Sequence, residues 1–492
     1  MPPLYTDFSS EYFQPVIPRA PSAAAAPRFF IRNGSMMVFI LIRNLRWWIG
    51  GLLFASTVIN YIDRQTLSVL APALKDQYHW TNTDFATVLI AFRVVYTVMQ
   101  LVSGRLLDRL GTRRGLSISV AFYSTVAACT ALARGLGSFR VLRGLLGAGE
   151  SAGWPGAAKA VSEWFPDRER AWAVALFDSG SSIGGAVAPF LVVFLLHTFG
   201  SWRPAFLITS SLGFLWLIVW KKMYYTPETH PRITPEELKL ILQGRRSGQE
   251  MAPSPVRRID VPRLLRFRQT WGIVVGRSLL DPYWFMMAEW FAIYLASKGF
   301  RMEESALGFW APFMAADLGN FFGGGLSSYW IRRGWSVGKS RRTVVALCGP
   351  AMLLLIPAAF SSRYWLLVGL FAFATFCYAA CSTIFISLPA DVFHTSAVAT
   401  VSGMSGTGAG IVTLVSTYLR ARVGPPVVPA DHHRSVYRAM SGRAGNGHAG
   451  ADGGHRPGGH SAQLLSEAEM VFDSAPSPIS CMKRWGIVEG RS

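Results

Sequence analysis

The chain has 492 residues, of which 51% are hydrophobic and only 15% are Asp, Glu, Lys or Arg. Soluble globular proteins carry about 25% charged residues, so this composition excludes an ordinary soluble domain; its richness in Phe (32), Trp (17) and Gly (47) indicates helices in lipid. The net charge of +20 would suit a nucleic-acid-binding protein, but the basic residues lie mostly between apolar runs. We therefore interpret them as cytoplasmic loops of a membrane protein and expect no nucleic-acid partner.

Residues 1–45 are expected to form a loose N-terminal cytoplasmic extension. The Ala-rich stretch Ala23–Ala26 precedes the first apolar run instead of following it, so we predict no cleavable signal peptide and an uncleaved first span. Met36 or Met37, just before a short apolar segment, is a natural alternative start.

A membrane-crossing helix needs about 20 mostly apolar residues, because lipid offers no hydrogen-bond partner to a bare backbone. Residues 46–221 contain six such runs, which we expect to form a first helical half. The predicted spans are Trp47–Leu74, Phe85–Leu107, Leu116–Ala133, Phe139–Ala160, Ala171–His197 and Pro204–Trp220.

A polar cytoplasmic linker, residues 222–270, separates this half from a second one, residues 271–419. Within the linker, Thr234-Pro235-Glu236-Glu237 followed by Leu238, Leu240 and Ile241 predicts a capped amphipathic helix. The predicted spans of the second half are Trp271–Leu295, Leu307–Trp330, Thr343–Phe360, Tyr364–Leu388 and Ala397–Leu419.

The predicted fold class is all-α and polytopic, with about 11 spans. Two halves of six spans are the usual build of transporters that rock around a midplane site, but the second half is one span short. Residues 420–492 turn abruptly into Gly, Arg, His and Pro, as in Gly442–Gly459, which predicts a disordered tail. Our hypothesis is that a frameshift or truncation replaced the twelfth span.

Basic residues set the predicted orientation. One set of alternate loops carries clustered cations, whereas the opposite loops are short and carry only scattered ones, so we place the clustered set and the N-terminus in the cytoplasm. The clustered cations are Arg109, Arg113, Arg114, Arg168, Arg170, Lys221, Lys222, Arg332, Arg333, Lys339, Arg341 and Arg342.

The loop between the second and third predicted spans reads Gly104-Arg105-Leu106-Leu107-Asp108-Arg109-Leu110-Gly111-Thr112-Arg113-Arg114. Gly104 and Gly111 permit a tight turn, and Asp108 at a helix end can pair with cations or with a helix N-terminus. The pattern resembles the G-x-L-x-D-R-x-G-x-[RK]-[RK] signature of the major facilitator superfamily, with a degenerate echo at Gly325–Gly334. The resemblance implies two pseudo-symmetric six-helix halves and a conformational latch formed by Gly104, Asp108, Arg109, Gly111 and Arg113.

Within that superfamily the chain resembles the anion:cation symporter family, on its branch of hexuronate/galactonate proton symporters. The segments that carry this resemblance are Asn60–Arg64, Arg143 with Gly147–Glu150, Phe177–Gly180, Asp281–Trp284, Ala316–Gly319 and Asp391–Phe393. The resemblance implies symport of a small organic anion, a hexuronate or an aldonate, with protons by alternating access. The proton gradient is then the energy source, and no cofactor is expected.

Several charged residues lie inside predicted spans, where an ionisable group costs several kcal/mol unless it is paired or hydrated. Asp63 and Arg64 lie deep in the first span, and Arg143 and Glu150 lie about two turns apart on one face of the fourth. Two interpretations stay open: structural ion pairs that brace helices, or a carboxylate beside a cation in a wet cavity, which is how a proton site is built.

The resemblance assigns roles to these positions. Asp63 and Glu150 match proton-coupling positions, and Arg143 matches the partner that Glu150 releases or recaptures. Arg64, Tyr61 and Tyr96 match substrate contacts, consistent with a guanidinium gripping a carboxylate through two hydrogen bonds.

Further substrate-site candidates depart from the family pattern or flank it. Arg93, one turn before Tyr96, is either a second carboxylate clamp or a snorkelling or ion-paired side chain. Asp178 stands where the family often has Asn, and Cys381-Ser382 where many relatives have Trp-Ser. Trp284 and Ser382 complete the predicted substrate-binding set.

No enzyme signature accompanies these features. The five cysteines form no metal spacing, so we expect neither a disulfide nor a metal, and the sequence contains no nucleotide loop or Ser/His/Asp set. We expect a monomeric, multi-pass protein of a bacterial-type inner cell membrane. The alternatives are a uniporter or exporter of another organic anion, or an inactive or non-transporting membrane protein because of the altered C-terminus.

Overall fold

The computed structural model describes residues 29–32, 35–38, 41–249, 261–297, 306–361 and 363–423. The tail predicted for residues 420–492 lies almost entirely outside the described residues, as does most of the extension predicted for residues 1–45. Of that extension, the structure describes a two-stranded antiparallel hairpin, β1 (Phe29–Arg32) and β2 (Ser35–Val38), in which Phe29 pairs with Val38.

Helices account for nearly all of the rest of the described chain. In the first half they are α1 (Leu45–Val69), α2 (Ala71–Tyr78), α3 (Asn82–Leu110), α4 (Thr112–Thr130), α5 (Leu136–Glu150), α6 (Gly153–Trp164), α7 (Asp167–Phe199) and α8 (Arg203–Met223). The linker contributes η1 (Pro227–Thr229), α9 (Pro235–Gln249) and α10 (Val261–Leu264). The second half contains α11 (Arg268–Ser297), α12 (Ala306–Arg332), α13 (Val337–Ala351), η2 (Met352–Leu354), α14 (Leu355–Phe360), α15 (Tyr364–Val392) and α16 (Val398–Val423).

Every predicted span overlaps one to three of these helices, and the all-α fold class is confirmed. Six helices within the described residues are long and apolar enough to cross a membrane by length and composition alone, so the number of spans stays a prediction. The fourth predicted span is two helices, because the chain turns at Ser151 and Ala152, directly after Glu150. The ninth is broken into α13, η2 and α14, near Pro350, whose missing N–H interrupts helical hydrogen bonding.

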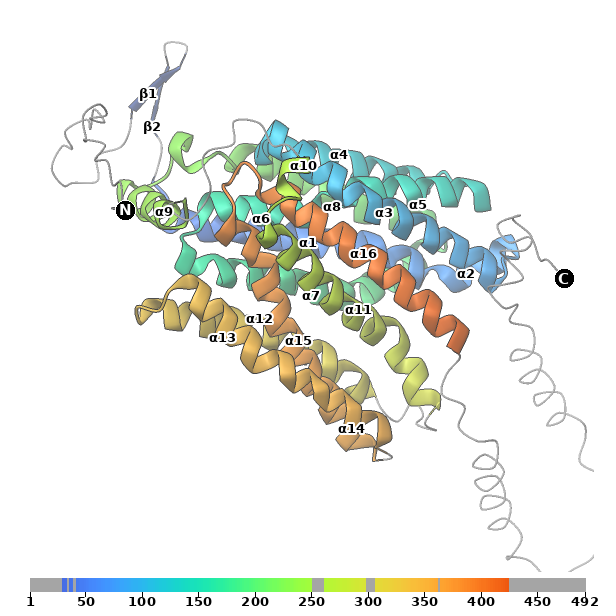
Figure 1. The fold of residues 1–492 in the computed structure, drawn as a ribbon. Helices are drawn as coiled ribbons and strands as arrows, with labels where there is room; N and C mark the ends of the chain where they lie inside the picture. Colours follow the sequence, from blue (N-terminus) through green and yellow to red (C-terminus); the bar gives the residue numbers. More distant parts are fainter. Residues whose placement is uncertain are drawn as a thin grey trace, which may run out of the picture.

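The helices run side by side in one elongated bundle (Figure 1). Helices α1–α8 pack mainly among themselves, as do α11–α16, and the two halves meet where α3 lies against α16 and α7 lies against α12. One end of the bundle carries the start of α1 at Leu45, the linker helix α9 and Asp108; we call it the linker face. The other end is the opposite face.

Glycines let the halves approach closely near the linker face. A Cβ on Gly104 of α3 would lie 2.3 Å from the Ala399 carbonyl oxygen, and one on Gly403 of α16 would lie 2.2 Å from that of Gln100. Both separations are shorter than any real carbon–oxygen contact, so only glycine fits. Glycines of α16 thus allow it to pack closely against α3 of the first half.

The linker helix α9 is tied to the first half. Thr234 accepts a hydrogen bond from the backbone N–H of Glu237 (3.3 Å), as the capped helix predicted from the sequence requires. The Glu237 carboxylate accepts from the N–H groups of Leu45 (2.9 Å) and Arg46 (3.0 Å), so it caps α1 as well. Ile241 is fully buried against the same half. The linker therefore fixes the start of the first long helix.

Candidate functional site

The best-defined buried ion pair near the centre of the first half joins α1 to α5. Arg64 donates to Glu150 Oε2 from Nη2 (2.9 Å) and from Nε (3.2 Å), and the Glu150 side chain is inaccessible to solvent. The Arg64 side chain keeps 25% of its surface exposed. Glu150 is thus enclosed in protein, whereas part of the Arg64 side chain is exposed.

Glycines on α5 explain how this pair forms. A Cβ on Gly147 would lie 2.5 Å from the Phe92 carbonyl oxygen of α3, and one on Gly149 would lie 2.8 Å from Tyr123 Cβ of α4. Because both positions lack a side chain, α5 sinks between α3 and α4 and carries Glu150 deep into the half. In the Gly147–Glu150 segment the glycines therefore allow the close packing that positions the charged side chain of Glu150.

Three aromatic rings surround the Arg64 guanidinium. Its central carbon lies 5.0 Å from the Tyr61 ring centre, 4.9 Å from that of Phe92 and 5.1 Å from that of Tyr96. Each distance is within the range of a cation–π interaction, which holds the guanidinium without using up its N–H donors. The structure thus brings together the three predicted substrate contacts Arg64, Tyr61 and Tyr96; Phe92 is an addition that the sequence did not single out.

Asp63 and Arg143 lie beside this pair but pair differently from expectation. Both Asp63 carboxylate oxygens are buried without a hydrogen-bond partner in the described structure, and the residue is 3% exposed. Arg143 donates from Nη2 to the backbone carbonyl of Arg64 (3.1 Å), while its Nε has no partner among the described residues. The expected Arg143–Glu150 pair is therefore replaced by Arg64–Glu150, because Arg64 meets the carboxylate directly from α1.

A second polar cluster lies in and against the other half. Arg277 of α11 is 7% exposed and donates to Asp281 one turn later (3.1 Å), and Asp317 of α12 accepts from Ser182 of α7 (2.8 Å). The predicted Asp178 of α7 faces the same helix: with the Asn320 amide turned to satisfy its neighbours, the amide nitrogen lies 3.3 Å from Asp178 Oδ2. Carboxylates and amides from both halves thus meet between α7 and α12.

The remaining predicted substrate residues are more dispersed. Trp284 stacks on Tyr378 (6.0 Å between ring centres) inside an aromatic cluster of the second half. The buried Ser382 lies one turn beyond Tyr378 on α15. Arg93 reaches from α3 across to the second half, where its guanidinium lies 5.1 Å from the centre of the Phe285 ring. The structure does not bring Trp284 and Ser382 to Arg64.

The predicted latch closes the linker face. Asp108 lies 2.6 Å from Lys159 Nζ and accepts from the backbone N–H (2.7 Å) and hydroxyl (2.7 Å) of Thr400, at the start of α16. Both partner types expected for this aspartate, a cation and a helix N-terminus, are present. Gly111 ends α3 with φ of 79°, in the left-handed region that favours glycine.

The two latch arginines do not join the halves. Arg109 is exposed, and Arg113 donates to the Lys221 carbonyl and lies over the Tyr225 ring (3.9 Å), which ties α4 to the end of α8. Within this motif, therefore, the contacts between the halves come from Asp108 and the close approach at Gly104.

A second link between the halves was missed by sequence reasoning. Asp391 of α15 accepts from Arg170 of α7 (3.2 Å) and from Arg341 of α13 (3.0 Å), and Arg170 also pairs with Asp167 (2.6 Å). Arg170 and Arg341 are 3% and 2% exposed. Both had been counted as loop cations, and the Asp391 segment quoted for the family resemblance was the only signal for this network.

Within the described residues, no group of three or more His, Cys, Asp or Glu side chains is arranged to hold a metal, and Cys129, Cys348, Cys377 and Cys381 are free. The side chains of the Arg64–Glu150 pair can form an ion pair and hydrogen bonds, and the carboxylate can exchange a proton.

Comparisons with known proteins agree with this architecture. A family model described as Major Facilitator Superfamily matches residues 53–417. The chain is 35% identical over 379 residues to the hexuronate transporter of Escherichia coli strain K12, an alignment that covers 76% of this chain and 86% of that protein. It is 37% identical over 284 residues to the galacturonate transporter of Dickeya chrysanthemi, covering 58% and 81% of the two chains.

Among solved structures, the fold is similar to the crystal structure of a variant of the Escherichia coli fucose:proton symporter. The TM-score is 0.55 at 15% sequence identity, and the match covers 76% of this chain and 92% of that one. At this identity the likeness concerns the fold alone.

Proposed function

The chain belongs to the Major Facilitator Superfamily and is a membrane transporter, not an enzyme, and we propose that it carries a sugar acid together with protons. The substrate class is a hexuronate or an aldonate, a monoanion with several hydroxyl groups. Transport follows alternating access, in which the two halves rock around a site between them.

The observation that carries this proposal is the Arg64–Glu150 ion pair. A guanidinium binds a carboxylate through two parallel hydrogen bonds, so the substrate carboxylate and Glu150 compete for the same donors on Arg64. Protonation of Glu150 removes its charge and weakens its hold on Arg64, which then binds the substrate. Binding of the anion and binding of the proton are thus coupled at one guanidinium.

Asp63 supplies a second proton site in this proposal. Its carboxylate is buried beside Glu150 and has no hydrogen-bond partner in the described structure. An unpaired buried charge costs several kcal/mol, and a bound proton removes that cost. When Asp63 is protonated, the repulsion that it exerts on a charged Glu150 also disappears.

The orientation follows from charge. The linker face carries the basic loops, so we place it, with the N-terminus, in the cytoplasm of a cell that holds the protein in its inner membrane. The contacts at Asp108 and Asp391 join the halves at this face. The structure then corresponds to the state closed toward the cytoplasm, in which the protein waits for substrate and protons from outside.

The test is uptake by purified protein in liposomes. An inward proton gradient should drive accumulation of labelled galacturonate or galactonate above its external concentration. Uptake that equilibrates but ignores the gradient would identify a uniporter of the same substrates. The absence of uptake for any sugar acid would contradict the proposed substrate class.

A further inference from the structure

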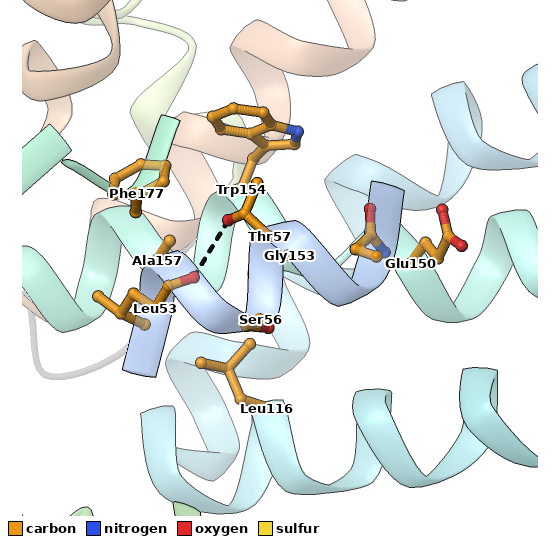
Figure 2. Close-up of a pocket in the computed structure, with 10 residues that line it drawn as sticks. Leu53, Ser56, Thr57, Leu116, Glu150, Gly153, Trp154, Ala157 and Phe177 are labelled. Carbon is orange, nitrogen blue, oxygen red and sulfur yellow. Dashed lines mark hydrogen bonds between the residues drawn. The ribbon is translucent and has the colours of Figure 1, made fainter. Parts of the chain in front are cut away.

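A cavity inside the first half begins beside Glu150 and extends toward the linker face (Figure 2). It is small, with room for about one or two water molecules. Its walls come from α1, α4, α5, α6 and α7. The lining residues are Leu53, Ser56, Thr57, Asn60, Leu116, Glu150, Gly153, Trp154, Ala157 and Phe177.

The cavity is polar at one end and apolar at the other. Asn60, Thr57 and Ser56 follow one another along α1 toward its start, and Glu150 of α5 lies beyond the Asn60 end of this row; Figure 2 labels Glu150, Thr57 and Ser56. Beyond them the walls are apolar, formed by Leu53, Leu116, Ala157 and Phe177. Asn60 and Leu53 are seven residues apart, about 10 Å along the helix. The cavity therefore covers about two turns of α1.

Glu150 lines this cavity beside the Asn60 amide, which interacts with its carboxylate, and one carboxylate oxygen makes no hydrogen bond of ordinary geometry. Its Oε2 is held by Arg64, whereas Oε1 is buried without a hydrogen-bond partner in the described structure. The residue is 1% exposed. A buried carboxylate oxygen normally has a partner, and an ordered water commonly supplies it where the protein does not. The free oxygen beside a polar cavity therefore points to water.

The charged and titratable groups around Glu150 lie elsewhere. Arg64 and Asp63 face it from α1, Tyr96 from α3, Tyr123 from α4, and Arg143 from its own helix. None of these side chains is among the residues that line the cavity. A proton that enters it meets hydroxyl and amide groups and no arginine, so the cations that hold the anion do not repel it.

We propose that the water in this cavity accepts the proton of Glu150, which then leaves toward the linker face through the interior of the first half. The sugar acid leaves separately, between the two halves. In the step itself the O–H bond of the protonated Glu150 breaks, a water molecule gains the proton, and the resulting carboxylate returns to Arg64. This inference rests on the proposed function and names the proton route that it leaves open.

The apolar end makes the route compatible with coupling. A continuous water path would let protons leak without substrate, whereas an apolar constriction blocks conduction until it becomes wet. In this proposal the apolar lining residues Leu53, Leu116, Ala157 and Phe177 supply that constriction while the linker face is closed. The route then conducts only after the linker face opens.

The test separates net uptake from exchange. In exchange, the carrier returns with substrate and proton still bound, so Glu150 need not lose its proton; net uptake requires the loss. Gly153 lines the cavity, and a Cβ there would meet nothing within 4 Å, so Gly153→Leu can fill the space without a clash at its Cβ. Gly51→Leu is the matched control, because Gly51 of the neighbouring α1 also has open space and does not line the cavity.

Gly153→Leu should slow net proton-driven uptake of galacturonate by about tenfold or more and leave exchange within about twofold. Gly51→Leu should change neither. Unchanged net uptake in Gly153→Leu, or an equal loss of both activities, would overturn the proposed route while the wild-type uptake still supports the proposed function.

A second variant keeps the test open if the larger side chain prevents folding. Thr57→Val removes a hydroxyl from the cavity at nearly constant shape and should slow net uptake more than exchange. Thr125→Val is its control, because each of these threonines donates to the carbonyl four residues earlier, and Thr125 is exposed on α4. Equal effects of the two substitutions would contradict the route.

Discussion

Replacing Glu150 by glutamine tests the proposed competition for Arg64. The substitution keeps the shape of the side chain and removes its charge, which is what a bound proton does. Arg64 then keeps its three neighbouring aromatic rings but loses the anionic partner that occupies its Nε and Nη2 donors. The variant should therefore behave as a carrier fixed in the protonated form.

The expected gain in affinity follows from the two hydrogen bonds that are weakened. Hydrogen bonds to charged groups contribute about 1.5–3 kcal/mol each, and a glutamine retains one neutral acceptor for Arg64. Glu150→Gln therefore removes about 1.5–3 kcal/mol of competition for Arg64. This corresponds to a dissociation constant for the anion that is lower by about 10- to 150-fold. In the wild type the same gain should develop as the pH falls, because protonation of Glu150 releases Arg64.

The assay is galacturonate binding to purified protein across a pH series, by calorimetry or tryptophan fluorescence. The wild type should bind more tightly at low pH, whereas Glu150→Gln should bind tightly throughout. Glu163→Gln is the control: Glu163 is a buried carboxylate of the same half that accepts from Thr112 (2.8 Å) and lies away from Arg64. It should keep the wild-type pH dependence. A Glu150→Gln variant with wild-type affinity at neutral pH and an unchanged pH profile would refute the competition.

Three further substitutions probe the remaining elements. Asp63→Asn should abolish accumulation against a gradient while preserving exchange; preserved accumulation in liposomes would remove Asp63 from the proton path. Gly104→Ala would place a Cβ 2.3 Å from the Ala399 carbonyl oxygen, an overpacking cost of about 1–3 kcal/mol that disfavours the closed linker face. A cysteine introduced at that face should then react faster with a thiol reagent, whereas Gly51→Ala should not change its reactivity. Asp391→Asn leaves two buried arginines without their shared carboxylate, a loss of about 3–5 kcal/mol that should lower the melting temperature in detergent; an unchanged value would show that the network contributes little.

The long apolar helices could be predicted from the sequence because lipid demands about 20 apolar residues per span. Their interruptions could not. The turn at Ser151 and Ala152, directly after Glu150, falls inside the predicted span Phe139–Ala160 and not at its end. Helix breaks of this kind depend on how neighbouring helices satisfy the freed backbone groups, which a hydropathy pattern does not encode.

The charged residues inside the membrane spans could be named from the sequence, but the ion pair that they form in the structure could not. Asp63, Arg64, Arg143 and Glu150 were singled out because charge inside a span is costly, and the structure places all four together. The family resemblance implied Arg143, which lies on the same helix, as the partner that Glu150 releases or recaptures. The actual partner, Arg64, comes from another helix, and the close approach that allows the contact depends on glycines whose neighbours are distant in the chain.

The basic residues show the same limit. The positive-inside rule treats Arg170 and Arg341 as loop cations, yet both are buried and share Asp391 across the two halves. Asp108 was easier to interpret because its motif predicted a partner at a helix N-terminus, and Thr400 provides one. The motif around Asp108 thus indicated a tertiary contact, whereas counting basic residues in loops did not.

The most direct measurement of the central claim is proton movement driven by the sugar acid alone. Liposomes that hold the protein and a pH-sensitive dye, with equal pH on both sides, are given an inward gradient of galacturonate. Coupling at the Arg64–Glu150 pair predicts that the interior acidifies as the sugar acid enters, and that Glu150→Gln takes up the sugar acid without acidification. Entry of galacturonate into wild-type liposomes with no change in internal pH would contradict the account.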